Sequence, residues 1–102
     1  MIVRIWHGRV PLAKAKDYRE FQIEKAIPDY RSVEGNISAE ILEREEGDVT
    51  HFLTITHWKN YEVIKRFAGE DIERAKYYPE DKNFLLEFEE KVLHYEVVAH
   101  SS

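Results

Sequence analysis

Hydrophobic and polar residues alternate in four stretches of the chain, which is the two-residue period of a β-strand. In residues 2–10, Val3 and Ile5 alternate with Arg4 and Trp6. The same alternation recurs in residues 37–44, in residues 49–58 and at the end of residues 88–98. A short acidic turn containing glycine separates the second stretch from the third, so we predict that these two form a β-hairpin.

Two other stretches repeat their hydrophobic residues every three or four positions, which indicates amphipathic α-helices. The first covers residues 12–27, and Pro28 is expected to end or kink it near Ala26 or Ile27 because proline lacks the N–H that a helix interior needs. The second covers residues 61–68, between Asn60 as its N-cap and Gly69 as the residue that stops it. Lysine, glutamate and arginine fill the other face of the first helix, so we expect only one of its faces to be buried.

The elements follow the order βαββαβ, which is the repeated split βαβ unit of ferredoxin-like α+β folds. Right-handed crossovers place the first and third strands at the centre of a four-stranded antiparallel sheet, with both helices on one face. We expect the two central strands to run parallel to each other. A further helical turn, capped by Asp71, is expected before Pro79. We predict one domain over residues 1–98 and a flexible polar tail over residues 99–102.

Each strand has two rows of side chains, and we expect the more aliphatic row to face the helices. That row consists of Val3, Ile5, Leu53, Ile55, Leu93, Tyr95 and Val97. The helix-free face would then carry Arg4, Trp6, Phe52, Thr54, Thr56, Trp58, His94 and Glu96. Monomers avoid an exposed patch with two tryptophans. We therefore expect a second copy to stack on this face and trap a small ligand, rather than residues 70–86 to cover it in part.

Arg4 and His94 are the main polar residues of this row. Antiparallel pairing of the first and last strands with matched chain ends places Arg4 beside Glu96 and Trp6 beside His94. A buried charge requires a partner, so Arg4 either forms a structural ion pair with Glu96 or holds an anionic substrate. His94 is the best candidate for a general base because histidine titrates near neutral pH. The alternative is a structural histidine bonded to Glu96 or Arg4.

Composition excludes several classes of function. The 102 residues make one domain, and 43% hydrophobic with 34% charged residues is typical of a folded chain. A net charge of −5 with scattered lysine and arginine argues against nucleic acid as a partner. Cysteine is absent and no hydrophobic run is long enough to span a membrane. We therefore expect a cytoplasmic protein without membrane contact, disulfides or thiolate chemistry.

The remaining polar clusters are interpreted as structural. His7 and His57 share the parity of the aliphatic row, so we expect them at the edge of the core. His51 and His57 lie about 20 Å apart along one strand, too far to share a metal ion. The acidic residues of segment 70–81 are expected to form a solvated surface. No metal site and no phosphate-binding loop is predicted.

Over residues 2–98 the chain resembles the antibiotic-biosynthesis-monooxygenase-type (ABM-type) domains, which are small dimeric α+β barrels. The resemblance rests on Arg4-Ile5-Trp6, Leu53-Thr54-Ile55-Thr56-His57-Trp58, Phe67-Ala68-Gly69-Glu70-Asp71-Ile72, Tyr77-Tyr78-Pro79-Glu80-Asp81 and His94-Tyr95-Glu96-Val97-Val98. Members of this family include oxygenases that oxidise polyphenols without a cofactor, quinol oxygenases, haem-degrading enzymes and proteins with no known activity. The resemblance implies a homodimer with a pocket for a small aromatic compound.

The resemblance also suggests roles for individual residues. In the cofactor-independent members the pocket deprotonates an electron-rich phenol, and the substrate carbanion reacts with oxygen. Such a pocket needs aromatic walls, a base and a fixed cation. Trp6 and Trp58 are the expected walls, His94 the base and Arg4 the cation, and no cofactor is expected. The other expected substrate-binding residues are Thr54, Thr56, Tyr77 and Glu96.

Two alternatives to this hypothesis remain. One is a non-catalytic ligand-binding or structural barrel, which an interior filled by side chains would favour. The other is haem binding. In the haem-degrading members an Asn, a Trp and a haem-ligating His define the site. The Trp corresponds to Trp58, whereas the Asn falls at or near Trp6 and the His at or near Tyr77. Both departures count against haem cleavage, although tyrosine is a known ligand of haem iron.

Overall fold

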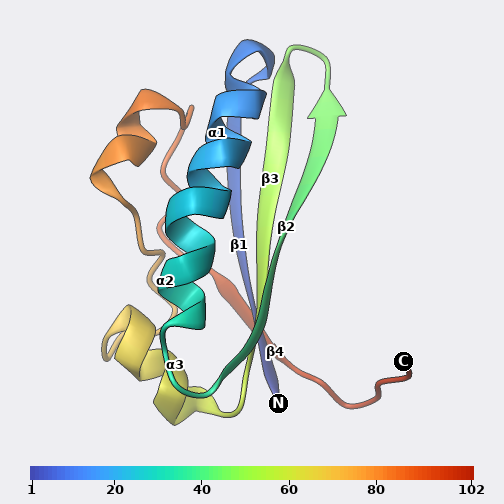
Figure 1. The fold of residues 1–102 in the computed structure, drawn as a ribbon, viewed down its shortest axis with the longest axis vertical. Coiled ribbons are helices and arrows are strands. Elements are labelled where there is room, and N and C mark those ends of the chain that lie inside the picture. Colours follow the sequence, from blue (N-terminus) through green and yellow to red (C-terminus); the bar gives the residue numbers. More distant parts are fainter.

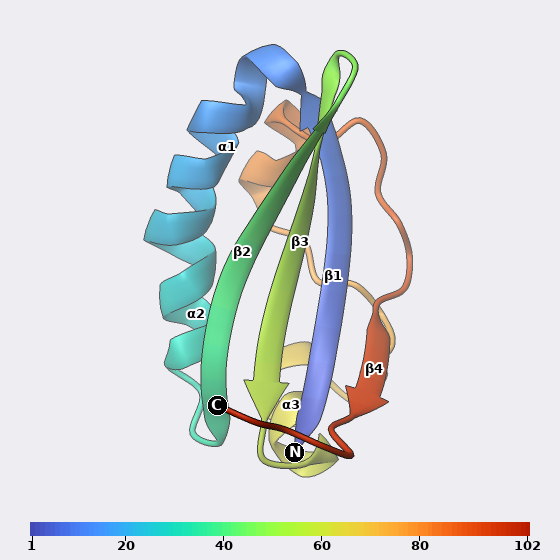
Figure 2. The same ribbon diagram turned by 90° about the vertical axis from the view of Figure 1, so that its right-hand side faces the viewer.

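The computed structural model describes residues 1–102 and has the predicted order of elements (Figure 1). These are β1 (Ile2–Pro11), η1 (Leu12–Lys14), α1 (Ala15–Phe21), η2 (Gln22–Ala26), α2 (Ile27–Arg31), β2 (Asn36–Glu46), β3 (Val49–Trp58), α3 (Tyr61–Ala68), η3 (Pro79–Asn83) and β4 (Leu93–Glu96). The helices lie on one side of the sheet, and Figure 2 looks onto the helix-free face. None of the helices is both long and apolar enough to cross a membrane.

The sheet has the strand order β2-β3-β1-β4, and every neighbouring pair is antiparallel. The prediction that the first and third strands lie at the centre is therefore confirmed. The expectation that these two strands run parallel is wrong. The crossover through the first helix makes β1 parallel to β2, and the β2–β3 hairpin then reverses the chain, so β3 must oppose β1.

The first helix continues past Pro28 instead of ending before it. The segments α1, η2 and α2 follow one another without a break from Ala15 to Arg31. Residues Gln22–Ala26 form a π-helical turn, and Pro28 lies in the first turn of α2. A π turn changes the hydrogen-bond register, and proline is tolerated in a first turn because its missing N–H is not needed there.

The second helix has the predicted bounds. The Asn60 side chain accepts a hydrogen bond from the Val63 N–H at 3.1 Å, which is an N-cap. Gly69 follows the helix with φ of 88°, a conformation that residues with a side chain rarely adopt. These local signals were sufficient to place α3 correctly.

The segment between α3 and β4 lacks the predicted helical turn. Residues 71–78 are irregular and pair instead with residues 90–92. The N–H of Ala75 donates to the carbonyl of Glu90 and the N–H of Val92 to that of Glu73, both at 2.8 Å. Hydrogen bonds to a distant segment thus replace those of a local helix.

The two faces of the sheet are the reverse of our expectation. Trp6 and Trp58 point toward the helices, and β3 alternates so that every buried residue lies in the same row as Trp58. The helix-free face carries Val3, Ile5, Leu42, Leu53, Ile55, Leu93 and Tyr95, which we call the aliphatic face. The physical reason is that both rows are largely apolar, so alternation alone does not fix which one is covered. The bulky aromatic row fills the deep layer under the helices.

The core has two centres, one around each tryptophan. Trp58 packs with Ile2, Ala26, Tyr30, Val63, Ile64 and Phe67. Trp6 packs with Val10, Ala15, Tyr18, Phe52, Leu85 and Val92. Between the two centres β1 contributes a buried Arg4, which is the polar centre of the predicted site.

Candidate functional site

Arg4 is a buried cation without a carboxylate partner. Its side chain projects from β1 toward the helices, and the residue is only 3% exposed. The guanidinium donates to the backbone carbonyls of Ile72 and of Arg74, the latter at 3.2 Å, and to Nε2 of His94 at 3.1 Å. Burial lowers the pKa of Arg4. Backbone dipoles and one imidazole thus solvate this charge and tie residues 72–74 to the sheet.

The expected ion pair between Arg4 and Glu96 does not form. β1 and β4 pair in a register that places Arg4 opposite His94, with Glu96 opposite Ile2 at the end of the strand. Glu96 is exposed. The predicted register is therefore wrong by two residues, an even shift that keeps His94 in the same row as Arg4. Aligning the ends of the first and last strands gave the wrong register because β4 is only four residues long and pairs with the first part of β1.

His94 is uncharged in this environment. Burial lowers its pKa, and the neighbouring Arg4 charge lowers it further. Because Arg4 has only donors, Nε2 of His94 accepts the hydrogen bond and the ring proton resides on Nδ1. His94 thus has the protonation state of a general base, although Arg4 engages its lone pair.

Trp58, Thr56 and Thr54 are packed inside the core. Trp58 is completely buried, and its Nε1 donates to Oγ1 of Thr56 at 2.8 Å. The Thr56 hydroxyl in turn donates to the carbonyl of Arg4 at 3.4 Å. Thr54 is 2% exposed. The structure therefore brings these three predicted site residues close to Arg4 but surrounds them with side chains.

Trp6 contains a buried donor that has no partner. The residue is 6% exposed, and its Nε1 makes no hydrogen bond. The indole lies over Gly8, where a Cβ atom would approach Cη2 of Trp6 to 2.5 Å. Tyr77 meets the indole edge-on, with ring centroids 6.2 Å apart. Unpaired buried N–H groups are rare in proteins.

Tyr77 links Trp6 to a cavity. Burial raises the pKa of Tyr77, and the interaction of its hydroxyl with the Trp6 indole opposes this shift. The hydroxyl donates to the Glu89 carbonyl at 2.5 Å, and the ring contacts Phe88 at 5.0 Å. The cavity has a volume of about 710 Å³ and is lined by Asp71, Glu73, Arg74, Ala75, Tyr77, Phe88, Glu89, Glu90 and Lys91. Sequence analysis identified Tyr77 but missed the rest of this lining.

Asp81 is a further residue that the sequence did not reveal. It was expected on a solvated surface but is 2% exposed. One carboxylate oxygen accepts from the Tyr18 hydroxyl at 2.9 Å and the other from the Tyr78 N–H at 2.6 Å. Burial raises its pKa. Asp81 therefore attaches the irregular segment to helix α1.

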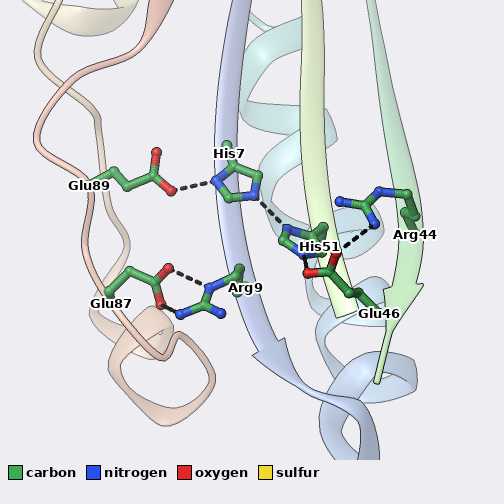
Figure 3. A network of polar contacts seen from close by, with 7 residues as sticks. All are labelled: His7, Arg9, Arg44, Glu46, His51, Glu87 and Glu89. Atoms are coloured by element: carbon green, nitrogen blue, oxygen red, sulfur yellow. Dashed lines mark hydrogen bonds and ion pairs between the residues drawn. The ribbon is translucent and has the colours of Figure 1, made fainter. Parts of the chain in front are cut away.

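His7 and His51 form a hydrogen-bonded chain on the helix-free face (Figure 3). His7 Nε2 lies 2.9 Å from His51 Nδ1, and the two rings stack with centroids 5.2 Å apart. At the outer ends, His7 Nδ1 contacts the Glu89 carboxylate and His51 Nε2 lies 3.0 Å from Glu46. His7 is thus not at the edge of the core as expected. No group of three or more histidine, cysteine, aspartate or glutamate side chains is placed to hold a metal ion.

Comparison with solved structures supports the fold. One match is a protein from Nitrosomonas europaea assigned to the antibiotic biosynthesis monooxygenases, with a TM-score of 0.69 and 17% identity over 97% of this chain and 100% of that one. A Bacillus cereus protein with the same assignment has a TM-score of 0.65 and 12% identity over 99% of this chain and 96% of that one. The chain has the ABM-type fold.

A further match is the heme-degrader MhuD from Mycobacterium tuberculosis, solved with two hemes bound in its active site. Its TM-score is 0.64, with 18% identity over 100% of both chains. No family model and no curated protein matches the sequence. At such low identities the similarity extends to the fold, so the function must be argued from the residues of this chain.

Proposed function

We propose that this protein is a homodimeric ABM-type barrel that binds a small phenol- or quinol-like compound and oxidises it with dioxygen without a cofactor. The observation that carries the proposal is the cavity beside Tyr77, next to the unpaired indole N–H of Trp6. The chain shares its fold with proteins assigned to the monooxygenases, and the residues described below are the basis of the proposed reaction.

The cavity has room for a small aromatic molecule, and its two cations lie among the carboxylates of Asp71, Glu73, Glu89 and Glu90. Tyr77 and Phe88 provide aromatic walls, and Arg74 and Lys91 provide positive charge for a phenolate. When the Tyr77 side chain turns aside, the indole N–H of Trp6 can donate to a ligand oxygen. Such a bond would satisfy the one polar atom of Trp6 that the folded chain leaves unpaired.

The proposed chemistry starts with removal of the phenolic proton. His94 accepts this proton on Nε2 once Arg4 releases that atom, and the Arg4 guanidinium then stabilises the anion. The substrate carbanion attacks dioxygen and forms a C–O bond, and the resulting peroxide takes the proton back from His94. Loss of water from this hydroperoxide gives the quinone, so one oxygen atom enters the product and the other leaves as water. Trp58 and Thr56 support the Arg4 backbone from within the core. Glu96 has no contact with this group, so the proposal gives it no role.

Oxygen consumption tests the proposed reaction. Wild-type protein should consume dioxygen with a quinol or an anthrone, and His94→Gln should lose most of this activity. Glutamine keeps an acceptor for Arg4 but does not act as a base at neutral pH. His57→Gln is the matched control, because His57 lies on the opposite face and bonds to Ser38. Equal rates for wild type and His94→Gln would refute the role of His94.

A non-catalytic ligand-binding barrel is the second candidate. It is favoured by the filled interior around Trp58, where Thr54 and Thr56 are also buried. This candidate predicts that a phenol quenches tryptophan fluorescence in a saturable way while no oxygen is consumed. Quenching together with oxygen uptake would instead support the enzyme.

Haem does not fit the residues present. Tyr77 stands where the resemblance places the iron ligand, but its hydroxyl is bonded to the Glu89 carbonyl and its pKa is raised. Ligation of iron requires the phenolate, which this environment disfavours. We expect no Soret shift when haem is titrated into the protein.

The aliphatic face supports the homodimer. Leu42, Leu93 and Tyr95 are 43%, 58% and 53% exposed there, and the chain's own tail does not cover them because Val98 is 91% exposed. In Figure 1 the tail extends outward on the helix-free side, and in Figure 2 it passes in front of the lower ends of β1, β3 and β2. Two sheets pack face to face through apolar rows of this kind. We therefore assign a second copy of the chain as the occupant of this face.

A further inference from the structure

The His7–His51 chain contains three hydrogen-bonding contacts in series. They join Glu89 to His7, His7 to His51, and His51 to Glu46 (Figure 3). Both ends of the series are carboxylates, which only accept hydrogen bonds when ionised. The pKa of Glu46 is lowered by its bonds to His51 and Arg44, so this end is ionised at neutral pH. Each contact requires one hydrogen, and the chain as a whole requires three.

Counting hydrogens shows which protonation state fits this geometry. Two neutral imidazoles carry two N–H hydrogens, which leaves one of the three contacts with two acceptors and no donor. Two imidazolium ions carry four, and then the N–H groups of His7 and His51 point at each other across 2.9 Å. Only one added proton on the pair satisfies all three contacts.

We propose that His7 and His51 share a single added proton, and that uptake of a second one drives the rings apart and weakens the dimer. The inference rests on the homodimer proposed above and adds regulation by pH to its interface. It uses only the geometry of the pair and the position of the pair on the sheet.

The other charged groups around the pair are already matched with one another. Arg9 binds Glu87 through two hydrogen bonds of 2.7 and 3.3 Å, and Arg44 binds Glu46 at 3.4 Å. The groups that face the pair come from β1, β2 and residues 86–92. They are Arg9, Glu43, Arg44, Glu46, Glu87 and Glu89. Because both arginines are paired with acids, the carboxylates that remain for the histidines are Glu89 and Glu46, and Glu46 is already shared with Arg44.

The pair adjoins the aliphatic face. A hollow of about 360 Å³ is lined by His7, His51, Leu42 and Leu53 together with Glu43 and Arg44. The His51 side chain is only 16% exposed even in the single chain. A second copy stacked on Leu42 and Leu53 would take these rings further from water, and a doubly charged pair is costly to bury. The dimer should therefore bind fewer protons than two separate chains, and acid should dissociate it.

Nitrogen NMR of the imidazoles tests the shared proton directly. At about pH 7.5, long-range ¹H–¹⁵N spectra should show three protonated nitrogens and one unprotonated nitrogen for the pair, with His7→Gln and His51→Gln giving the assignment. Two neutral rings, or two fully protonated rings, at this pH would overturn the inference. This measurement does not depend on dimer formation.

Analytical ultracentrifugation tests the link to association. Between about pH 7.5 and about pH 5 the dimer Kd should rise about 100-fold, the effect of one pKa unit in each of the two His7–His51 pairs of the dimer. His51→Gln should make the dimer Kd nearly independent of pH. His57→Gln is the control and should leave the pH dependence unchanged, because His57 lies on the same strand and face but does not take part in the His7–His51 hydrogen bonds. A wild-type dimer with the same Kd at both pH values overturns this inference alone. A wild-type protein that is monomeric at both overturns the proposed dimer as well.

Discussion

Gly8 is required where the indole of Trp6 crosses the β1 backbone. A Cβ atom there would lie 2.5 Å from Cη2 of Trp6 and 2.9 Å from Cδ2 of Leu85. We expect Gly8→Ala to lower the free energy of unfolding by about 1–3 kcal/mol through overpacking, as measured by urea denaturation. In a Trp6→Leu background the same change should cost less, because the contacts with the indole are gone and only the contact with Leu85 remains. An equal loss in both backgrounds would contradict this explanation.

Asp81 should make stability depend on pH in a defined direction. Its pKa in the folded protein is raised from 3.8, so the native state holds this proton more firmly than the unfolded chain. The stability that protonated Asp81 contributes to the fold is therefore fully present below about pH 4. It is lost as the pH rises through the pKa of Asp81 in the folded protein. We expect Asp81→Asn to cost about 1–2 kcal/mol at the acid end, where a hydrogen-bond acceptor is lost, and less at neutral pH.

Urea denaturation of both proteins at about pH 4 and at about pH 7 measures this difference. Asp71→Asn is the control, since Asp71 is an exposed carboxylate of the same irregular segment. A gap between wild type and Asp81→Asn that widens with rising pH would show that the charged form of Asp81 is the stabilising one.

The sequence indicated which residues lie near the candidate site better than it indicated what they contact. Arg4 and His94 were expected on one face of the sheet and do contact each other. Glu96 was expected to share that contact but is exposed at the end of β4, because register depends on the length of the partner strand. Gly8 offered a usable signal, since glycine inside a strand marks a close approach. Asp81 offered none, because its partner Tyr18 is 63 residues away.

At the scale of elements, the N-cap of α3 provides a test. The Asn60 side chain accepts from the Val63 N–H, one of the helix donors without an internal partner. We expect Asn60→Ala to lower the free energy of unfolding by about 1 kcal/mol, whereas Asn60→Asp should be close to neutral because aspartate caps equally well. Thermal unfolding of the three proteins distinguishes them. A similar loss for both variants would mean that the cap is not what stabilises α3.

Elements with local signals were predicted well, and those that depend on distant segments were not. The hairpin and α3 follow from a glycine turn, a capping residue and a stop residue, all within the element itself. Residues 71–78 have a helical pattern but bond to residues 90–92, which no local rule reveals. Pro28 is tolerated because a π turn precedes it, and the sequence pattern contains no sign of that turn.

At the scale of the whole molecule, the sequence pattern did not determine which face of the sheet is exposed. Both rows of β1 and β3 contain large apolar side chains, so the choice depends on what the helices can accommodate. Arg4 could join the covered row only because the carbonyls of Ile72 and Arg74 lie within reach. An exposed apolar surface was nevertheless predictable, because either row would leave one uncovered.

Leu53 lies near the centre of the aliphatic face, paired with His7 on one side and Leu42 on the other. We expect Leu53→Glu to raise the dimer Kd at least about 100-fold, because the twofold arrangement would bury two unpaired carboxylates. Ile23→Glu is the matched control. Ile23 is a 54% exposed aliphatic residue on the helical side, so the same charge there should leave association unchanged.

Sedimentation velocity over a range of concentrations measures this difference, and circular dichroism checks that both variants fold. A monomeric Leu53→Glu together with a dimeric Ile23→Glu would assign the interface to the aliphatic face. Equal weakening by both substitutions would indicate a loss of folding stability, and an unaffected Leu53→Glu dimer would place the contact elsewhere. In that last case the His7–His51 chain would lie outside the interface, and the pH dependence of association should vanish with it.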